Sequence, residues 1–448
     1  MRAPSGVRYG IVSVAIGVGL LCTGCSSAHP SSSTPSTAGQ LAALSCVWPI
    51  AANADTLSAN SELNIHNPDT AAAYWIMAYT VQDGMRITLR GHFPDSRYMS
   101  LEVYSSQGLP FSTNGVSSAL ADYRIAPDPG SVNPWQHKAE PGGSFTVTLE
   151  SDVSSGQANV LPLAPAGTPA GTAGLIFFRV YAPAYRSPQQ VALPRVTFTL
   201  DGMSRQVPAC PASSTLNSQA AAQVLHVLGL SLPAGGSTPA NSAPAGFSPG
   251  EIIPFAQGSA AAGSTPDTDT RYLSAEVEPP RNGDVLVIRA KAPTTPGGPA
   301  PDPWPATGVD LRYWSICNDI LAPPTPVVVN HLPGGKVNLG CRYDSQIALD
   351  QEGYYTIVIG TESQRAAIER IPGATFIPLS LANPDQPYKI YLRNMLPNPA
   401  FAEAVQNVPP DANPGSAATV MGPYYPRLGF CSLSTLMASG PDACLAAT

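Results

Sequence analysis

The stretch Met85-Arg86-Ile87-Thr88-Leu89-Arg90 alternates apolar and polar side chains with a period of two residues. This is the pattern of a β-strand that places one face against a core and the other toward solvent. Further alternating or strongly apolar segments follow at residues 98–104, 144–149, 175–181 and 196–200. The sequence therefore predicts an all-β fold.

The same motifs return in the second half of the chain in the same order. Matching pairs are Pro68-Asp69-Thr70 with Pro266-Asp267-Thr268, Gly84 before Ile87–Arg90 with Gly283 before Leu286–Arg289, Arg97-Tyr98-Met99-Ser100 with Arg312-Tyr313-Trp314-Ser315, Gly143–Val147 with Gly353–Ile357, and Phe177-Phe178-Arg179 with Tyr391-Leu392-Arg393. The spacing is similar in both halves apart from a Pro-rich insertion, 294–305. This order predicts a tandem duplication. We expect two related β-sandwich or jelly-roll-like domains.

Between the two repeats the composition changes. Ser214 or Thr215 is suited to cap a helix whose apolar side includes Leu216 and Val224. Residues 233–250 are rich in Pro, Gly, Ala and Ser and predict a linker. The expected organisation is a signal peptide at 1–24, a flexible tether at 25–45, an N-terminal β domain at 46–210, a helix plus linker at 211–249, and a C-terminal β domain at 250–448.

Six cysteines follow the tether, and an even number in an exported chain favours disulfides. Six cysteines allow fifteen connectivities. Their positions favour Cys46–Cys210 around the first repeat, Cys317–Cys341 within the second, and Cys431–Cys444 at the end. None forms a C-x-x-C pair, and the histidines form no cluster with ligand spacing, so we expect no metal and no cofactor.

The N-terminus carries a targeting signal. Arg2 and Arg8 precede an apolar run, 11–21, that is too short to span a bilayer, and Thr23-Gly24-Cys25 follows. This arrangement resembles the lipobox of bacterial lipoproteins, with Cys22 where leucine is usual. The resemblance implies that Cys25 is lipidated (a palmitate-bearing anchor) and holds the protein on the extracytoplasmic face of the cell membrane. The alternative is a secreted protein cleaved nearby, with Cys25 as a spare thiol.

Composition narrows the choice of partners. Charged residues make up 12% of the chain, against about 25% in typical globular proteins, whereas its 49 Pro and 39 Gly are above average. In this respect the chain is similar to actinobacterial cell-envelope proteins. Without residues 1–24, which include Arg2 and Arg8, the formal net charge of −7 becomes −9. No run of Lys or Arg remains, so we expect no binding to nucleic acids.

We assign no catalytic residue. Gly246-Phe247-Ser248-Pro249-Gly250 matches G-x-S-x-G, but the serine follows a linker instead of a strand, and Pro249 removes an N–H that an oxyanion hole requires. An enzyme would need residues dispersed along the fold to converge in a pocket, at least two of them from His92, Asp95, Asp319, Asp344 and Glu352.

The repeated Arg-Tyr-x-Ser motif supplies the candidate binding residues, Arg97, Tyr98, Arg312, Tyr313 and Trp314. On a strand, Arg312 and Trp314 share a face, where a guanidinium beside an indole can hold a sugar ring or an anionic headgroup. In the alternative, Tyr98 and Tyr313 fill the core and the arginines tie strands through carboxylates or carbonyls. Further aromatic residues able to line a cleft are Tyr181, Tyr185, Tyr424 and Tyr425.

These observations lead us to expect a membrane-anchored envelope lipoprotein that acts as a non-enzymatic binding or scaffolding module. Its partner would be a glycan, a lipid or an envelope protein. The competing class is a dispersed-site hydrolase or other carbohydrate-active enzyme of the cell envelope.

Overall fold

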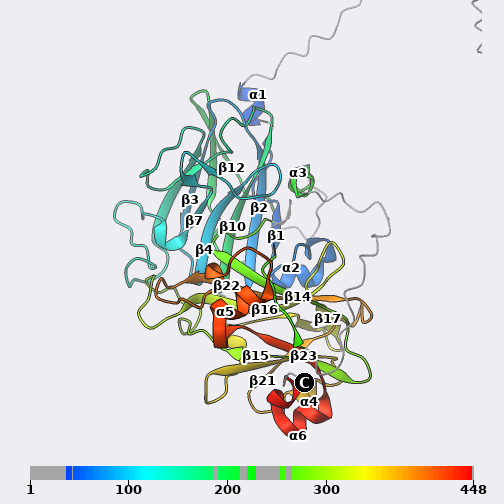
Figure 1. Cartoon of the computed structure of the whole chain (residues 1–448). Coiled ribbons are helices and arrows are strands. Elements are labelled where there is room, and N and C mark those ends of the chain that lie inside the picture. The colour runs from blue at the N-terminus through cyan, green and yellow to red at the C-terminus, as the bar shows by residue number, and fades with distance from the viewer. Residues whose placement is uncertain are drawn as a thin grey trace, which may run out of the picture. The chain divides into compact units, whose positions relative to one another are not determined.

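Strands dominate the structure, a computed structural model that describes residues 37–42, 44–184, 190–211, 219–228, 252–258 and 265–445 (Figure 1). The predicted lipidation site Cys25, the G-x-S-x-G sequence and the linker 233–250 lie outside the described residues. The helix predicted between the repeats is present as α3 (Gln219–Val227), and it packs on β2 and β10 of the first repeat. No helix within the described ranges is long and apolar enough to cross a membrane.

The first copy of the repeat folds as two five-stranded sheets, in the orders β1-β2-β10-β4-β7 and β12-β11-β3-β8-β9. All neighbouring strands are antiparallel except β8 and β9. Apolar side chains from both sheets meet in one core. The strands are β1 (Ile50–Ala52), β2 (Ala72–Thr80), β3 (Arg86–His92), β4 (Ser96–Tyr104), β7 (Ala119–Ala121), β8 (Ser144–Glu150), β9 (Val160–Pro162), β10 (Ala173–Pro183), β11 (Arg195–Leu200) and β12 (Met203–Val207).

The second copy also has two sheets, in the orders β14-β22-β16-β19 and β13-β23-β15-β20-β21. A second core lies between them. The strands are β13 (Ile252–Ile253), β14 (Thr270–Val277), β15 (Asp284–Lys291), β16 (Leu311–Ile320), β19 (Cys341–Tyr343), β20 (Tyr354–Gly360), β21 (Ala374–Pro378), β22 (Tyr388–Pro397) and β23 (Arg427–Ser432).

Short elements complete the two copies. Two small hairpins are β5 (Ser112–Thr113) with β6 (Val116–Ser117), and β17 (Val329–Leu332) with β18 (Lys336–Leu339). The other α-helices are α1 (Thr37–Ala42), α2 (Ala54–Ala59), α4 (Arg365–Ile368), α5 (Pro414–Met421) and α6 (Leu433–Cys444). The 3-10 helices are η1 (Ser61–Leu63), η2 (Asp122–Arg124), η4 (Asp344–Gln346), η5 (Val405–Asn407) and η6 (Gly422–Tyr424).

The two copies share one topology, as the repeated motifs predicted. The order β2-β10-β4-β7 is repeated as β14-β22-β16-β19, and β11-β3-β8-β9 is repeated as β23-β15-β20-β21. Even the exceptional parallel pair recurs, because β20 and β21 are parallel like β8 and β9. Each matched motif lies on corresponding strands or immediately before them. The prediction of an all-β fold built from two related sandwiches is confirmed.

The strands β4 and β16 differ from the others because every residue in them is buried. In an ordinary sandwich, one face of each strand packs on the core and the other meets water. Here Met99 and Leu101 of β4 face the first core, and Trp314 and Ile316 of β16 face the second. Their opposite faces are covered by the other copy, and the described residues from Thr37 to Leu445 form one compact unit.

The three disulfides have the predicted connectivity. Cys46–Cys210 joins the two ends of the first copy, where Val47 forms a β-bridge with Ala209. Cys317–Cys341 links directly opposed residues of β16 and β19. Cys431–Cys444 fastens α6 to β23.

Loss of the Cys46–Cys210 bridge is expected to destabilise the fold most. It spans 164 residues, whereas Cys431–Cys444 spans 13. A crosslink removes chain entropy from the unfolded state, by about 5 kcal/mol for a loop of over 100 residues and about 3 kcal/mol for a loop near 15. Replacing Cys46 and Cys210 together by serine should therefore lower the free energy of urea unfolding more than the same change at Cys431 and Cys444. An equal or smaller loss would contradict this entropic account.

Candidate functional site

All five predicted binding residues lie in the interior, which corrects the expectation of an exposed Arg–aromatic surface. Tyr98 and Tyr313 are 0% exposed, and Arg97, Arg312 and Trp314 are 1% exposed. Trp314 packs in the second core against Tyr355, with 5.1 Å between ring centroids. Burial to this degree leaves no surface on which a glycan or headgroup can lie.

Arg97 and Arg312 instead form reciprocal ion pairs between the two copies. Arg97 Nη1 donates to both carboxylate oxygens of Asp344, at 3.1 and 3.2 Å. Arg312 Nη1 donates to both oxygens of Asp122, each at 3.2 Å. The acceptors occupy corresponding places, since Asp122 begins η2 after β7 and Asp344 begins η4 after β19. Each arginine also donates to the backbone oxygen of the other, at 3.2 Å.

The tyrosines of the same motif repeat this exchange. Tyr98 OH donates to Asp267 Oδ1 at 3.3 Å, and Tyr313 OH donates to Asp69 Oδ2 at 2.8 Å. These aspartates belong to the matched Pro-Asp-Thr motifs that precede β14 and β2. Each copy thus contributes a hydroxyl donor from β4 or its counterpart β16, and a carboxylate acceptor from the loop before its first long strand.

A third exchange uses backbone oxygens. Arg179 Nη2 in β10 donates to Thr265 O at 2.8 Å, and Arg393 Nη2 in β22 donates to Asn67 O. The contact therefore has approximate two-fold symmetry, as in an isologous dimer interface. We call it the polar joint, and it comprises Asp69, Arg97, Tyr98, Asp122, Arg179, Asp267, Arg312, Tyr313, Asp344 and Arg393.

The predicted Pro-rich insertion 294–305 covers one end of the polar joint. Gly298 O accepts a hydrogen bond from Arg97 Nε at 2.6 Å. The guanidinium carbon of Arg312 lies 4.9 Å from the ring centroid of Trp304, which is itself 8% exposed. The insertion therefore helps to exclude water from the reciprocal ion pairs.

The two copies differ at Glu102, beside the joint. Glu102 of β4 corresponds to Cys317 of β16. The Glu102 carboxylate accepts hydrogen bonds from Arg179 Nη1 and Tyr104 OH, both at 2.6 Å. Burial raises the pKa of Glu102 to about 7, against the opposing effect of the Arg179 charge.

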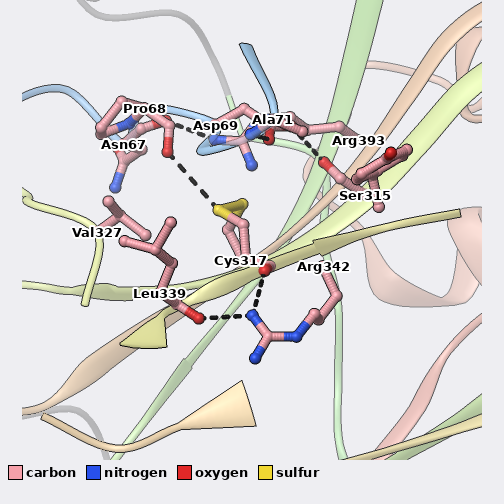
Figure 2. The surroundings of a disulfide bond; sticks show 12 residues. Asn67, Pro68, Asp69, Ala71, Ser315, Cys317, Val327, Leu339, Arg342 and Arg393 are labelled. Atoms are coloured by element: carbon pink, nitrogen blue, oxygen red, sulfur yellow. Dashed lines mark hydrogen bonds between the residues drawn. A yellow bond between two sulfur atoms is a disulfide. The ribbon is translucent and has the colours of Figure 1, made fainter. Parts of the chain in front are cut away.

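In the second copy this position holds the Cys317–Cys341 disulfide, shown with its surroundings in Figure 2. Cys341 Sγ lies 3.7 Å from Pro68 O of the first copy, and Ser315 Oγ donates to Asp69 at 2.6 Å. In the described part of the chain, one group has potential ligand atoms close enough together to hold a metal ion. It consists of Asp69, Cys317 and Cys341. Because both cysteines are oxidised, this group cannot supply thiolate ligands.

A cleft on the second copy has a volume of about 310 Å³, against about 30 Å³ for a hollow beside Tyr104 in the first copy. The larger volume lies within the range of about 300–1,000 Å³ for small-molecule sites. The cleft is lined by Arg289, Ala290, Tyr354, Gly422, Pro423, Tyr425 and Arg427. We call it the Arg–Tyr cleft.

Two arginines stand directly opposite one another in this cleft, Arg289 on β15 and Arg427 on β23. The first copy has the same arrangement, with Arg90 on β3 opposite Arg195 on β11. Like charges at directly opposed sheet positions are destabilising. The cross-strand arginine pair therefore does not stabilise the sheet, and its presence in both copies needs another explanation.

Carboxylates balance the arginine pair in the second copy. Arg289 Nη2 donates to Asp350 Oδ2 at 2.7 Å, and Arg427 Nη2 donates to Asp442 Oδ1 at 2.8 Å. Partial desolvation acts to raise the pKa of Asp350, but the Tyr354 N–H and the Arg289 guanidinium outweigh it and hold this pKa below its usual range. Each arginine of the cleft is therefore paired with a carboxylate.

Two aromatic rings also line the cleft, those of Tyr354 and Tyr425. The guanidinium carbon of Arg289 lies 5.1 Å from the ring centroid of Tyr354. Tyr425 OH donates to Phe255 O and accepts from Phe255 N, both at 2.8 Å, which fixes its ring. Of the other aromatic residues named from the sequence, Tyr181 is buried at the joint, and Tyr185 lies outside the described residues.

The residues considered for a dispersed enzyme site lie on separate elements. His92 is exposed at the end of β3, and Glu352 is exposed in a turn. Asp319 and Asp344 are buried in the second copy, where Asp344 is paired with Arg97. Within the described ranges, no hydrogen bond or ion pair joins any two of His92, Asp95, Asp319, Asp344 and Glu352.

Neither a known protein family nor a curated protein matches this sequence. Solved structures with a similar course include an uncharacterised protein from Burkholderia cenocepacia, with 11% identity over 83% of this chain and 79% of that chain and a TM-score of 0.44. The VPA0106 protein from Vibrio parahaemolyticus has 10% identity over 82% of this chain and 90% of that chain, with a TM-score of 0.39.

Breaking one reciprocal ion pair should destabilise the protein strongly. Replacing Arg312 by alanine leaves Asp122, which is 0% exposed, without its cation. Loss of one partner from a buried pair costs about 3–5 kcal/mol. Removing both partners should cost less than the sum of the single changes, measured by urea unfolding.

The matched control is Arg86→Ala at the exposed Arg86–Glu150 pair, with an expected loss of roughly 0–1 kcal/mol. Similar losses at both sites would contradict the assigned role of the joint.

Proposed function

We propose that this protein is a lipid-anchored binding module of the bacterial cell envelope and that its Arg–Tyr cleft binds a glycan. The lipobox-like sequence ending at Cys25 supports the location, and three disulfides are typical of exported proteins. The observation that carries the proposal is the cleft itself, in which two arginines lie beside two tyrosine rings, with a carboxylate paired to each arginine.

Sugars present hydroxyl groups that both donate and accept hydrogen bonds, together with apolar ring faces. The guanidinium groups of Arg289 and Arg427 supply donors, and the carboxylates of Asp350 and Asp442 supply acceptors. The rings of Tyr354 and Tyr425 offer stacking surfaces. Because the arginines and carboxylates are balanced in number, the cleft favours a neutral sugar over a strongly anionic headgroup.

The first copy provides an internal comparison. It keeps the arginine pair, Arg90 and Arg195, but Ser144 occupies the position that corresponds to Tyr354. It therefore lacks a stacking ring beside the guanidinium groups. This difference supports our choice of the second copy for the proposed glycan site.

Substitutions in the cleft should weaken glycan binding. We expect Tyr354→Ala and Arg427→Ala each to raise the Kd for short hexose or N-acetylhexosamine oligosaccharides about tenfold, equivalent to about 1.4 kcal/mol. Titration calorimetry with the folded protein provides the measurement. Both side chains are partly exposed, so the free energy of unfolding should change little.

Arg90→Ala and Arg195→Ala are the matched controls, because they remove the equivalent arginine pair from a face without the tyrosine ring. Their Kd should equal that of the wild type. Binding that is insensitive to Tyr354→Ala and Arg427→Ala would remove the cleft assignment. If the pure protein steadily turned over envelope glycans or esters, it would be an enzyme, and the proposal of a non-enzymatic binding module would be wrong.

The anchor is tested separately. Cys25→Ala should release the protein from the membrane fraction into the soluble fraction, because the acyl chains would no longer be attached. Fractionation followed by immunoblotting measures this. Membrane association equal to that of the wild type would contradict lipidation at Cys25 and leave the cleft proposal unaffected.

A further inference from the structure

The polar joint contains the same aspartate site twice, once in each Pro-Asp-Thr motif. At the first site, Asp69 Oδ1 accepts from the Ala71 N–H at 2.9 Å. Asp69 Oδ2 accepts from Tyr313 OH at 2.8 Å and from Ser315 Oγ at 2.6 Å. Both carboxylate oxygens are therefore satisfied by donors.

The second site has the same parts but fewer bonds. Asp267 Oδ1 accepts from the Asp269 N–H at 3.0 Å, just as Asp69 accepts from Ala71. Asp267 Oδ2 and Ser100 Oγ, the counterpart of Ser315 Oγ, have no hydrogen-bond partner within the described residues, although Asp267 is 3% and Ser100 is 1% exposed. Buried polar atoms without partners are unfavourable, so the hydrogen bonding at this site is incomplete and costs free energy.

One difference between the copies acts directly on the tyrosine hydroxyl of this site. Asp269 stands where the first copy has Ala71, and its carboxylate competes for the tyrosine hydroxyl. Tyr98 OH lies 2.8 Å from Asp269 Oδ2 and 3.3 Å from Asp267 Oδ1, whereas Tyr313 OH at the first site has Asp69 alone. The second carboxylate therefore draws the Tyr98 donor away from Asp267.

The charges around Asp269 disfavour its ionised form. Asp267 and Glu102 are nearby acids, and Arg179 is already bonded to Glu102 at 2.6 Å. Across η2, Asp122 is paired with Arg312, and Arg124 is exposed. Burial and the Asp267 charge together raise the pKa of Asp269 to about 7. The neutral side chains packed around this cluster are the phenols of Tyr98, Tyr104, Tyr181 and Tyr272.

We infer that Asp269 makes the polar joint responsive to pH. When Asp269 is protonated, its negative charge is lost. The Tyr98 hydroxyl can then donate to Asp267 alone, as the Tyr313 hydroxyl donates to Asp69. With Asp269 ionised, two carboxylates compete for one donor and repel each other, and the contact between the copies loosens at this end.

The direction of the effect follows from proton binding. Below about pH 4, Asp269 is protonated in both the folded and unfolded chains. Between about pH 4 and pH 7 the folded chain keeps a proton that the unfolded chain has lost. The contribution of Asp269 to stability therefore falls as pH rises through this window and becomes constant above it. This is opposite in sign to the usual effect of a paired carboxylate.

The experiment compares the mature protein with Asp269→Ala, which rebuilds the first site at the second. We expect the variant to have a Tm roughly 2–4 °C above that of the wild type at about pH 8, and a much smaller difference at about pH 5. Asp269→Asn, which mimics the protonated acid, should behave in the same way. Asp302→Ala, an exposed aspartate, is the control and should show no pH-dependent difference.

Hydrogen exchange localises the effect. The Thr265 amide donates to Gly108 O at the second site, and the corresponding Asn67 amide donates to Thr325 O at the first. After correction for intrinsic rates, Thr265 should lose several-fold more protection than Asn67 between about pH 5 and pH 8, and Asp269→Ala should abolish the difference. Equal pH dependence at the two amides, or a Tm change in Asp269→Ala that is the same at both pH values, would overturn the inference.

Discussion

The reciprocal burial of Arg97 against Asp344 and of Arg312 against Asp122 is the interaction on which the rest of the structure depends. Each guanidinium is removed from water by the other copy, and each carboxylate that neutralises it comes from that copy. A buried charge without its partner is strongly unfavourable. Neither sandwich can therefore present this face alone at low cost, which explains why β4 and β16 carry polar side chains on strands that are buried throughout.

The sequence was sufficient to predict the strands, the duplication and the disulfide pairing, because these depend on local alternation and on the order of motifs. It also placed Tyr98 and Tyr313 at equivalent positions. What it did not predict was the partner of each motif. A strand such as Ser96–Tyr104 has the same residue pattern whether its polar side chains meet water or the other copy, so its sequence does not reveal that Arg97 and Tyr98 are buried. Trp314 faces the second core. The alternative, in which arginines bind carboxylates and carbonyls, describes their contacts correctly.

The Arg–Tyr cleft was missed for a related reason. Arg289 appeared in the sequence as part of a repeated strand motif, and Tyr425 as one of several aromatic residues without a location. Only strand pairing shows that Arg289 lies opposite Arg427 and that Arg90 lies opposite Arg195. The one signal in the sequence was that Arg90 and Arg289 occupy the same place in the repeated strand motif. The cleft lies on the sheet that does not take part in the polar joint, so the two features occupy different sheets of one sandwich.

The approximate two-fold symmetry of the joint has a consequence for how its two sites can change over time. In a homodimer, every substitution at an isologous interface appears twice, so an acidic residue introduced at one site is introduced at its mate as well. Joining both copies in one polypeptide removes that restriction. Glu102 can face Arg179 while its counterpart Cys317 forms a disulfide, and Asp269 can occupy one loop while Ala71 remains in the other. A single chain that carries both copies can therefore hold two different sites at symmetry-related positions, which a homodimer of identical chains cannot.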